Sequence, residues 1–275
     1  MTEGVIIKGV GGQYTVDTKQ GQYICNARGL FRKKNITPIV GDWVQINNTT
    51  LMAILPRKNE LRRPRVANVD QVVVVMAAAL PQLHFAMLDR YLMQAEHENI
   101  DAAICINKID LDDNVPAKVK EIYEPAGYPF FAVSVSNNEG FAGLLEFLQN
   151  TTTVLAGPSG VGKSSIINSL TKKELETGTV SKKIGRGRHT TRHAEFIPIN
   201  DGGYIIDTPG FSSLDPPDVP QNDKAALFKE FRPWLGQCKF RDCLHWSEQD
   251  CAIKEQIGKS IDPMRYERYL EILQS

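Results

Sequence analysis

Hydrophobic and polar residues alternate in short runs over the first 65 residues of the chain. The runs at 4–8, 12–16, 22–26 and 42–46 are separated by Gly, Pro and Asn residues. A period of two is typical of half-buried β-strands. Roughly five strands in so short a stretch favour a small closed barrel, with the OB-fold as the first candidate.

The pattern changes after residue 69, where apolar strands alternate with amphipathic helical stretches. Its predicted elements are strands at 70–78, 101–106 and 129–135 and helices at 85–99, 115–126 and 140–149. Alternation of this kind indicates an α/β domain with a parallel sheet. The apolar run at 72–80 suits a buried parallel strand and is too short to cross a bilayer.

A phosphate-loop motif lies between a β-branched strand and a helix that opens at Lys163. The pattern Gly-x-x-x-x-Gly-Lys-Ser places a nest of backbone N–H groups at a helix N-terminus, where anions bind. Lys163 is expected to reach the β- and γ-phosphates, and the Ser164 hydroxyl to bind Mg²⁺. An ordinary glycine-rich turn is the alternative, against which the Lys-Ser pair argues. The predicted phosphate-binding residues are Gly157, Pro158, Ser159, Gly160, Val161, Gly162, Lys163, Ser164 and Ser165.

The tetrapeptide NKID at 107–110 follows a predicted strand, where GTPases carry their guanine-recognition element. The Asp110 carboxylate can accept hydrogen bonds from N1–H and the 2-amino group of guanine, whereas adenine offers no matching donors. Asn107 would bond the base and a neighbouring loop, and the stem of Lys108 would cover the ring face. An Asn-rich helix cap would explain the motif alone, so its coexistence with a phosphate loop decides the interpretation. The predicted loop against guanine O6 contains Ser134 and Val135.

Two later segments have the pattern of nucleotide-sensing switches. The glycine-rich, basic stretch 184–193 would place Thr191, or else Thr190, over Mg²⁺ and the γ-phosphate. A further strand ends in Asp-Thr-Pro-Gly. We expect Asp207 to hold Mg²⁺ through water and the backbone N–H of Gly210 to sense the γ-phosphate.

Two features depart from an ordinary GTPase. Phe211 stands where Ras-like enzymes carry the Gln that orients the attacking water, so unaided hydrolysis should be slow and should rise when a partner reorders the switch. The base motif also precedes the phosphate loop and both switches. The sequence therefore describes a circularly permuted GTPase domain, in which the segment after the second switch is attached directly to the nucleotide sensor.

Three cysteines and one histidine cluster towards the C-terminus in the pattern Cys-x₄-Cys-x-His-x₅-Cys. Four such ligands suit tetrahedral Zn²⁺, and in a reducing compartment clustered thiols favour metal over disulfide. The pattern offers no evident open position, so we predict one structural zinc ion; scattered thiols beside a surface histidine are the alternative. Cys25 and Cys105 are isolated and are predicted to be buried thiols. The predicted zinc ligands are Cys238, Cys243, His245 and Cys251.

The last predicted element is an amphipathic helix at 263–274. Its apolar stripe consists of Tyr266, Tyr269, Leu270 and Leu273. The fold prediction is a multidomain chain: an all-β OB barrel, an α/β circularly permuted phosphate-loop GTPase domain, and a mainly helical zinc-binding domain. The predicted limits are 1–65, 66–214 and 215–275.

The charge of the chain is unevenly distributed. The formal net charge of the 275 residues is zero, but residues 1–65 hold eleven Lys/Arg against four acidic residues, a net of +7. Together with Phe31 and Trp43, predicted to be exposed, this favours nucleic-acid binding by the barrel. A solvated basic face with core aromatics is the alternative. The N-terminus lacks the features of a signal peptide, so we predict a cytoplasmic protein.

With these motifs assembled, the chain resembles the RsgA (YjeQ-type) ribosome small-subunit-dependent GTPases. The resemblance spans nearly all residues and rests on ARGLFRK and VGDWV, on the order NKID, GPSGVGKSS, GRGRHTTRH and DTPGF, and on the Cys/His tail. It implies a late role in maturation of the small (30S) ribosomal subunit, with GTP hydrolysis stimulated by that subunit and coupled to release. It also implies a catalytic switch histidine, here His189, although contact with phosphate or RNA would fit His189 equally well.

Three functions follow from these patterns. The favoured one is a GTP-hydrolysing assembly factor in which Lys163 and Mg²⁺ neutralise phosphoryl charge and His189 helps to place water. The second is an rRNA-binding sensor of guanine nucleotides, including guanine alarmones, in which hydrolysis is incidental. The third, a small-molecule phosphotransferase, is opposed by the NKID motif. We expect a monomer that binds the small subunit, its rRNA and GTP or GDP, and no membrane.

Overall fold

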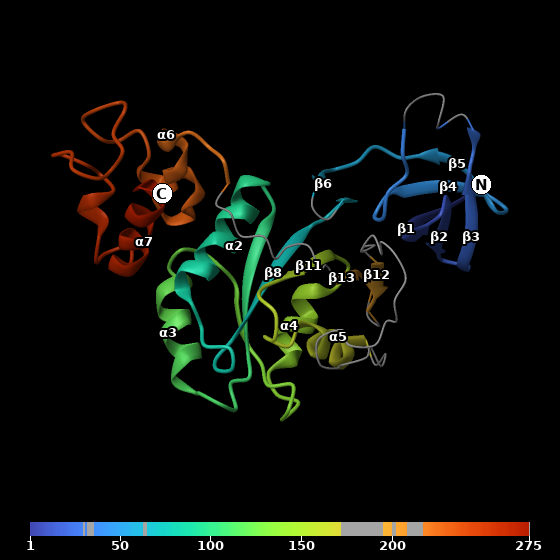
Figure 1. Ribbon diagram of the computed structural model, residues 1–275, viewed down its shortest axis with the longest axis horizontal. Coiled ribbons are helices and arrows are strands. Elements are labelled where there is room, and N and C mark those ends of the chain that lie inside the picture. The colour runs from blue at the N-terminus through green and yellow to red at the C-terminus, as the bar shows by residue number, and fades with distance from the viewer. Residues whose placement is uncertain are drawn as a thin grey trace, which may run out of the picture. The chain divides into compact units, whose positions relative to one another are not determined.

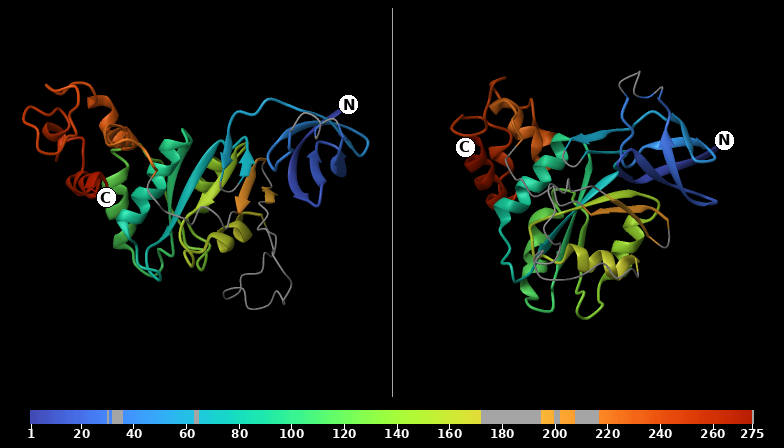
Figure 2. Two further views of the ribbon diagram at one scale, coloured as in Figure 1. Left: turned by 45° about the horizontal axis from the view of Figure 1, so that its top comes forward. Right: turned by 45° about the vertical axis from the view of Figure 1, so that its right-hand side comes forward.

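The computed structural model describes residues 1–29, 31, 36–62, 65–171, 195–199, 202–207 and 217–274, with Arg62, Glu195 and Asp207 described by their backbone alone. Figures 1 and 2 show the helices and strands of the chain. The chain forms two compact units, each assembled from separate segments. Unit 1 consists of Met1–Gln71, Ala142–Leu155 and Lys163–Ser212. Unit 2 consists of Val72–Phe141, Ala156–Gly162 and Ser213–Ser275.

Unit 1 contains a closed barrel with the strand order β1-β2-β3-β5-β4 (Figure 1). The barrel strands are β1 (Thr2–Val10), β2 (Gln13–Thr18), β3 (Gly21–Ala27), β4 (Trp43–Asn47) and β5 (Thr50–Ile54). In β4 the side chains of Val44 and Ile46 are buried, Gln45 between them is half-buried, and the two end residues are exposed, as a strand with one face on a core requires. The predicted small all-β barrel is confirmed.

The two aromatic residues predicted to be exposed on the barrel have different environments. Trp43 is 46% exposed, as predicted, whereas Phe31 is only 8% exposed, so the prediction for Phe31 is wrong. The backbone turns at this point, because the N–H of Phe31 donates to the carbonyl of Arg28 and its own carbonyl accepts from the N–H of Ile36. Removing the ring from water is favourable, so this segment buries its aromatic side chain.

A hairpin that the patterns did not predict follows the barrel, formed by β6 (Glu60–Arg62) and β7 (Arg65–Ala67). Upstream of it, the fully buried Asp42 accepts hydrogen bonds from Nε and Nη2 of Arg57 at 2.6 and 2.9 Å and from the N–H of Ile39 at 2.8 Å. Gly41 has φ of +91°, and a Cβ there would clash with the carbonyl of Ala67. Glycine at position 41 therefore permits the close approach of the two backbones.

Strands and helices alternate from residue 71 to residue 171. In unit 2 the strand order is β10-β9-β8, and β10 pairs with β9 in parallel; in unit 1 the order is β11-β13-β12, with β11 parallel and β12 antiparallel to β13. The predicted α/β class is confirmed. The elements are β8 (Gln71–Ala77), α2 (Phe85–His97), β9 (Asp101–Asn107), α3 (Asn114–Tyr123), β10 (Phe130–Ala132), α4 (Phe141–Leu148), β11 (Thr152–Ala156), α5 (Lys163–Thr171), β12 (Glu195–Pro198) and β13 (Tyr204–Asp207).

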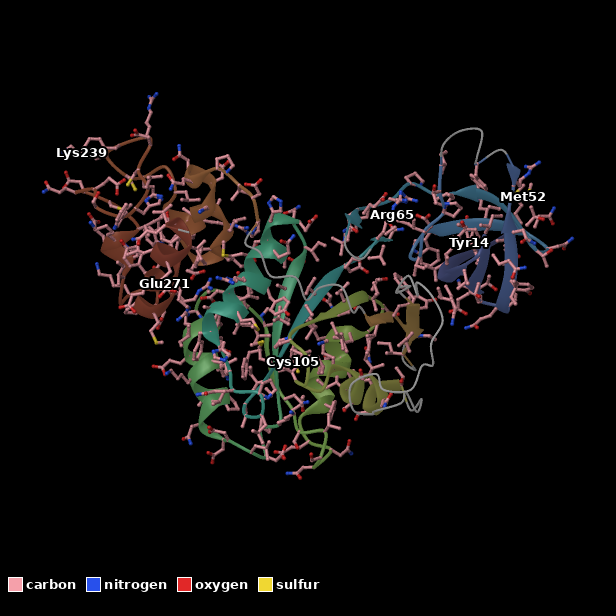
Figure 3. The ribbon with its side chains drawn as sticks, viewed as in Figure 1. Tyr14, Met52, Arg65, Cys105, Lys239 and Glu271 are labelled. Atoms are coloured by element: carbon pink, nitrogen blue, oxygen red, sulfur yellow. The ribbon has the colours of Figure 1, made fainter. Side chains whose placement is uncertain are left out.

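The core of the α/β part lies along its central strands. All seven residues of β8 are buried, and Cys105 in β9 is completely buried among the strands (Figure 3). Burial raises the pKa of the Cys105 thiol to about 12, so the thiol stays protonated. Cys25 in the barrel is also completely buried. Both isolated cysteines are buried thiols, as predicted.

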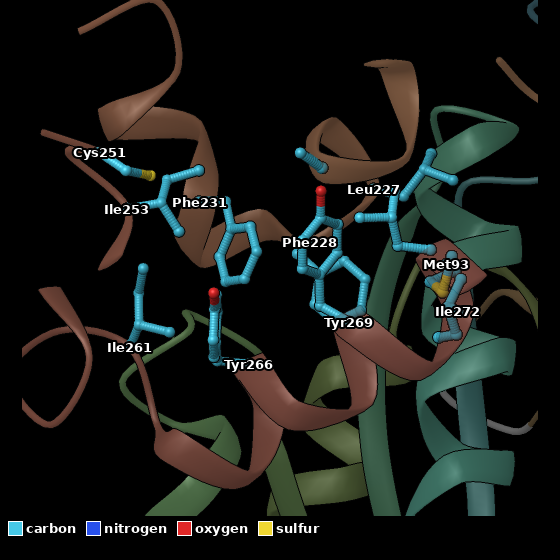
Figure 4. Close-up of a cluster of buried hydrophobic side chains, with 12 residues drawn as sticks. Met93, Leu227, Phe228, Phe231, Cys251, Ile253, Ile261, Tyr266, Tyr269 and Ile272 are labelled. Carbon is cyan, nitrogen blue, oxygen red and sulfur yellow. The ribbon is translucent and has the colours of Figure 1, made fainter. Parts of the chain in front are cut away.

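The C-terminal part of unit 2 is built from short helical elements around an aromatic cluster (Figure 4). Its elements are α6 (Gln221–Lys224), η1 (Ala225–Leu227), η2 (Lys229–Trp234), η3 (Lys254–Gln256) and α7 (Pro263–Gln274). Three of the four predicted stripe residues on α7 are buried, and the fourth, Leu270, packs against the cluster. Met93 of α2 belongs to the same cluster. Within the described residues, no helix is both long and apolar enough to cross a membrane.

Candidate functional site

The phosphate-loop motif lies where β11 ends and α5 begins, as predicted. Two of its glycines are required by close contacts. Gly157 has φ of +135°, and a Cβ there would clash with the backbone carbonyl of Val75 in β8; Gly162 has φ of +96°, and a Cβ would clash with the amide of Asn107. The loop is therefore shaped by its neighbours within unit 2, with Ser159 and Gly160 exposed on its surface.

Asn107 connects the phosphate loop to the predicted base-contacting loop. It ends β9, is 2% exposed, and its Nδ2 donates to the carbonyl of Val161 at 2.9 Å. Its Oδ1 accepts from the backbone N–H of Val135 at 3.4 Å. A buried amide that satisfies both loops holds them in one arrangement.

Lys108 also contacts the phosphate loop. Its Nζ donates to the carbonyl of Gly160 at 2.7 Å and to the carbonyl of Leu80. The residue has φ of +61°, which is uncommon for a side chain with a Cβ. Three segments of unit 2 therefore meet at one ammonium group: the NKID motif, the phosphate loop and the segment that precedes α2.

Asp110 and Ser134 are brought together by a short hydrogen bond. The completely buried Ser134 hydroxyl donates to Oδ1 of Asp110 at 2.5 Å and accepts from the N–H of Asn137 at 3.1 Å. Asp110 itself is exposed. A carboxylate oriented by a buried hydroxyl and open on its outer side has the geometry to accept hydrogen bonds from a planar ligand.

The remaining predicted nucleotide residues have different positions. Lys163, Ser164 and Ser165 form the first turn of α5 and are half-buried. Asp207 ends β13, where its backbone is described. His189, Thr190, Thr191, Gly210 and Phe211 lie outside the described residues, so their predicted roles stay predictions.

The four predicted metal ligands converge in unit 2. Their ligand atoms all lie within 4.8 Å of one another, in the set Cys238, Cys243, His245 and Cys251. The Sγ atoms of Cys238 and Cys251 are 3.8 Å apart, and they lie 3.5 and 3.4 Å from Nδ1 of His245. Tetrahedral zinc with Zn–S of about 2.3 Å and Zn–N of about 2.1 Å requires separations of about 3.8 and about 3.6 Å. The donor set is therefore compatible with zinc.

The loop that carries His245 is held by groups that sequence reasoning missed. The Glu248 carboxylate accepts from the N–H groups of Leu244 and Trp246 at 2.7 and 2.8 Å. From α7, the hydroxyl of Tyr266 donates to the carbonyl of His245 at 2.7 Å, and that of Tyr269 donates to the carbonyl of Leu244 at 2.6 Å. The helical stripe predicted that both rings face a core. It carried no information about the targets of their hydroxyls.

Comparison with known families matches two models to the first 217 residues of the chain. A model described as RsgA GTPase matches residues 54–217, and one described as RsgA N-terminal domain matches residues 3–52. The small ribosomal subunit biogenesis GTPase RsgA of Ruminiclostridium cellulolyticum is 44% identical over 99% of this chain and 93% of its own length. The protein of the same name from Alkaliphilus metalliredigens is 42% identical over 99% of this chain and 97% of its own.

Solved structures agree with this assignment over the whole chain. YjeQ from Thermotoga maritima superposes with a TM-score of 0.85 at 32% identity, covering 99% of this chain and 97% of that one. YloQ, described as a circularly permuted GTPase, gives a TM-score of 0.82 at 37% identity, covering 100% and 94%. The fold and the order of its motifs define a circularly permuted phosphate-loop GTPase. Within that class, the chain belongs to the RsgA GTPase family.

Proposed function

We propose that this GTPase acts in late maturation of the small ribosomal subunit, hydrolysing GTP to GDP and phosphate with stimulation by that subunit. The observation that supports guanine-nucleotide chemistry is the position of Asn107, whose single amide bonds both the phosphate loop and the loop after β10. The ribosomal role is supported by the name of the relatives, small ribosomal subunit biogenesis GTPase. The domain limits at 65 and 214 belong to the same proposal.

Guanine is selected by hydrogen bonding at Asp110. The Ser134 hydroxyl donates to one oxygen of Asp110 and so orients the whole carboxylate. The carboxylate then accepts hydrogen bonds from N1–H and the 2-amino group of the base. Lys108 is anchored to the phosphate loop, so its stem covers the base while its ammonium group fixes the loop. Adenine would leave the carboxylate desolvated and unpaired, which is costly.

Hydrolysis depends on charge neutralisation and on placing a water molecule. Lys163 and the N–H groups of the phosphate loop bind the phosphates, and Ser164, Thr191 and Asp207 are the proposed holders of Mg²⁺. Bound with GTP, Mg²⁺ would neutralise charge on the β- and γ-phosphates. His189 is the proposed group that places the attacking water, since Phe211 has no donor or acceptor. The N–H of Gly210 would sense the γ-phosphate.

The barrel is proposed to bind the subunit, and the C-terminal domain is proposed to be stabilised by zinc. The basic barrel, with Trp43 exposed on β4, would contact rRNA by phosphate pairing and stacking. One structural zinc ion would be held by the Cys₃His set. We further propose a cytoplasmic monomer, with guanine alarmones as competitors of GTP at the same site.

The deciding experiment is GTP turnover by the purified protein, alone and with small ribosomal subunits. We expect slow turnover alone and a stimulation of about 100-fold or more by subunits; an arginine supplied by a partner gives other GTPases about 10³- to 10⁵-fold. Large subunits at the same concentration are the matched control. Tight GTP binding without stimulation would contradict the proposal and would favour an rRNA-binding sensor of guanine nucleotides.

A further inference from the structure

A cluster of buried charges connects α7 to α2 and η2. Arg265 is 1% exposed and donates from Nη1 to Asp89 of α2 at 2.6 Å. Its Nε and Nη2 donate to the two carboxylate oxygens of Glu230 at 2.6 and 2.9 Å. Arg268, one turn further along α7, donates from Nε to the second oxygen of Asp89. Two cations and two anions thus balance one another in a buried cluster.

Helix α3 joins the same cluster through an aromatic residue. The hydroxyl of Tyr123 donates to Asp89, and its ring centroid lies 5.1 Å from the guanidinium carbon of Arg265. The Tyr123 ring also stacks on Phe85, the first residue of α2, with centroids 6.5 Å apart. Burial makes the loss of one charged partner costly, because the other is left unpaired. The two arginines therefore tie α7 firmly to both α2 and α3.

A neighbouring stripe of α7 contacts the metal loop. Tyr266 and Tyr269 lie one residue after Arg265 and Arg268, and their hydroxyls donate to the carbonyls of His245 and Leu244. One stripe of α7 therefore contacts the loop of metal ligands, and the adjacent stripe supplies the two buried arginines. A rigid helix held on both sides transmits a displacement of one contact to the other.

Both helices held by the cluster continue from nucleotide-site segments. Helix α2 begins at Phe85, shortly after Leu80, whose carbonyl accepts from Lys108. Helix α3 begins at Asn114, shortly after Asp110. We infer that zinc binding and guanine-nucleotide binding are thermodynamically coupled through α7, an inference that rests on the guanine-binding function proposed above. Coupling of this kind is reciprocal: zinc tightens GDP binding, and GDP tightens zinc binding by the same factor.

The test measures the affinity of the full chain for a fluorescent GDP, with zinc and after removal of zinc by a chelator. Zinc removal should weaken GDP binding about 5- to 10-fold, within the usual range of coupling between sites. In Arg268→Gln the zinc-loaded protein should bind GDP more weakly, and zinc removal should have little further effect. Tyr269→Phe removes only the hydroxyl that bonds Leu244 and keeps the ring packed, so zinc and GDP binding should be less strongly coupled in this variant than in the wild type, but more strongly than in Arg268→Gln. Glu267→Gln, exposed on the same helix, is the matched control.

Hydrogen exchange of residues 85–123 gives a readout that needs no nucleotide. Zinc removal should speed exchange in α2 and α3 of the wild-type chain, because the cluster loosens. Unchanged GDP affinity after zinc removal would overturn the coupling, whatever the exchange in α2 and α3 shows. If the zinc-loaded protein bound no guanine nucleotide, the proposed function would fail, while faster exchange in α2 and α3 would still support the link through α7.

Discussion

The proposed base selectivity rests on one carboxylate, that of Asp110. Its Oδ1 accepts from the buried Ser134 hydroxyl, so the carboxylate is oriented before any base binds. Selectivity of this type comes from the penalty for burying an acceptor without a donor, and a single substitution can redirect it.

Substituting Asp110→Asn should therefore exchange the preferred base. The new amide donates where the carboxylate accepted, which opposes the N–H donors of guanine and suits the 2-oxo group of xanthine. GTP affinity should fall about 100-fold or more while xanthosine triphosphate gains affinity. Equilibrium binding of both nucleotides measures the exchange, and Asp113→Asn, an exposed neighbour, is the control. Unchanged GTP affinity would show that Asp110 does not contact the base.

Tyr91 supplies a test of stability and its pH dependence. Its side chain is 1% exposed, and its hydroxyl has no hydrogen-bond partner among the described residues. Burying an unpaired hydroxyl is unfavourable, so Tyr91→Phe should raise the free energy of unfolding by about 1 kcal/mol at neutral pH. Urea unfolding measures this, with the exposed Tyr23→Phe as the control. A less stable Tyr91→Phe would show that the hydroxyl is bonded.

The contribution of Tyr91 to stability should decrease at alkaline pH. Burial raises the pKa of Tyr91 to about 12, above its ordinary value. The folded state therefore favours the neutral phenol. This contribution to stability is complete below a pH of about 10 and is lost as the pH rises towards 12. Wild-type protein should lose more stability than Tyr91→Phe between a pH of about 9 and about 11.

At the scale of elements, the loop that carries His245 is held by hydrogen bonds from Glu248, Tyr266 and Tyr269, and we propose that its four metal ligands complete its stabilisation. Cys243→Ser should lower bound zinc from about one ion per chain to nearly none, since a serine hydroxyl replaces a thiolate poorly. The C-terminal elements should then become sensitive to proteolysis while the barrel does not. Metal analysis and limited proteolysis measure both effects. The control is Cys25→Ala, a substitution in the barrel, and this variant should still bind one zinc ion per chain. If Cys243→Ser also bound one zinc ion per chain, the proposed ligand set would be excluded.

The elements with a strong local signal could be predicted from the sequence. Period-two alternation predicted the barrel strands, and the glycines of the phosphate loop predicted its strand-to-helix turn. Helix α7 shows the limit of such signals. Its tyrosines were predicted to face a core. From the sequence alone, Arg265 and Arg268 are typical of a solvent-exposed helix face, yet both are buried. Their burial depends on Asp89, which lies more than 170 residues away in the sequence.

The same limit explains the two barrel aromatics. Trp43 and Phe31 lie in similarly polar stretches, so both were predicted to be exposed. Phe31 is turned inwards by backbone hydrogen bonds to Arg28 and Ile36, and no local periodicity reveals such a turn. For His189 and Thr191, prediction rests on motif resemblance alone, because both lie outside the described residues.

At the scale of the whole molecule, the N-terminal 65 residues differ from the rest of the chain in net charge. Residues 1–65 carry a net +7 in a chain whose total is zero. Trp43 borders two hollows of unit 1, of 560 and 650 Å³, and Lys19 lines the larger one. Binding of a subunit by this barrel would combine counterion release at lysines and arginines with stacking on Trp43.

These two contributions can be separated by salt. Trp43→Ala should weaken subunit binding about 5- to 100-fold through lost stacking, without changing the slope of log affinity against log salt. Lys19→Gln should lower that slope by about 1. Binding titrations at several salt concentrations measure both. Phe31→Ala is the matched contrast, because its ring is buried and its loss should reduce thermal stability instead. If Trp43→Ala left subunit affinity unchanged at every salt concentration, β4 would not be part of the RNA-binding surface.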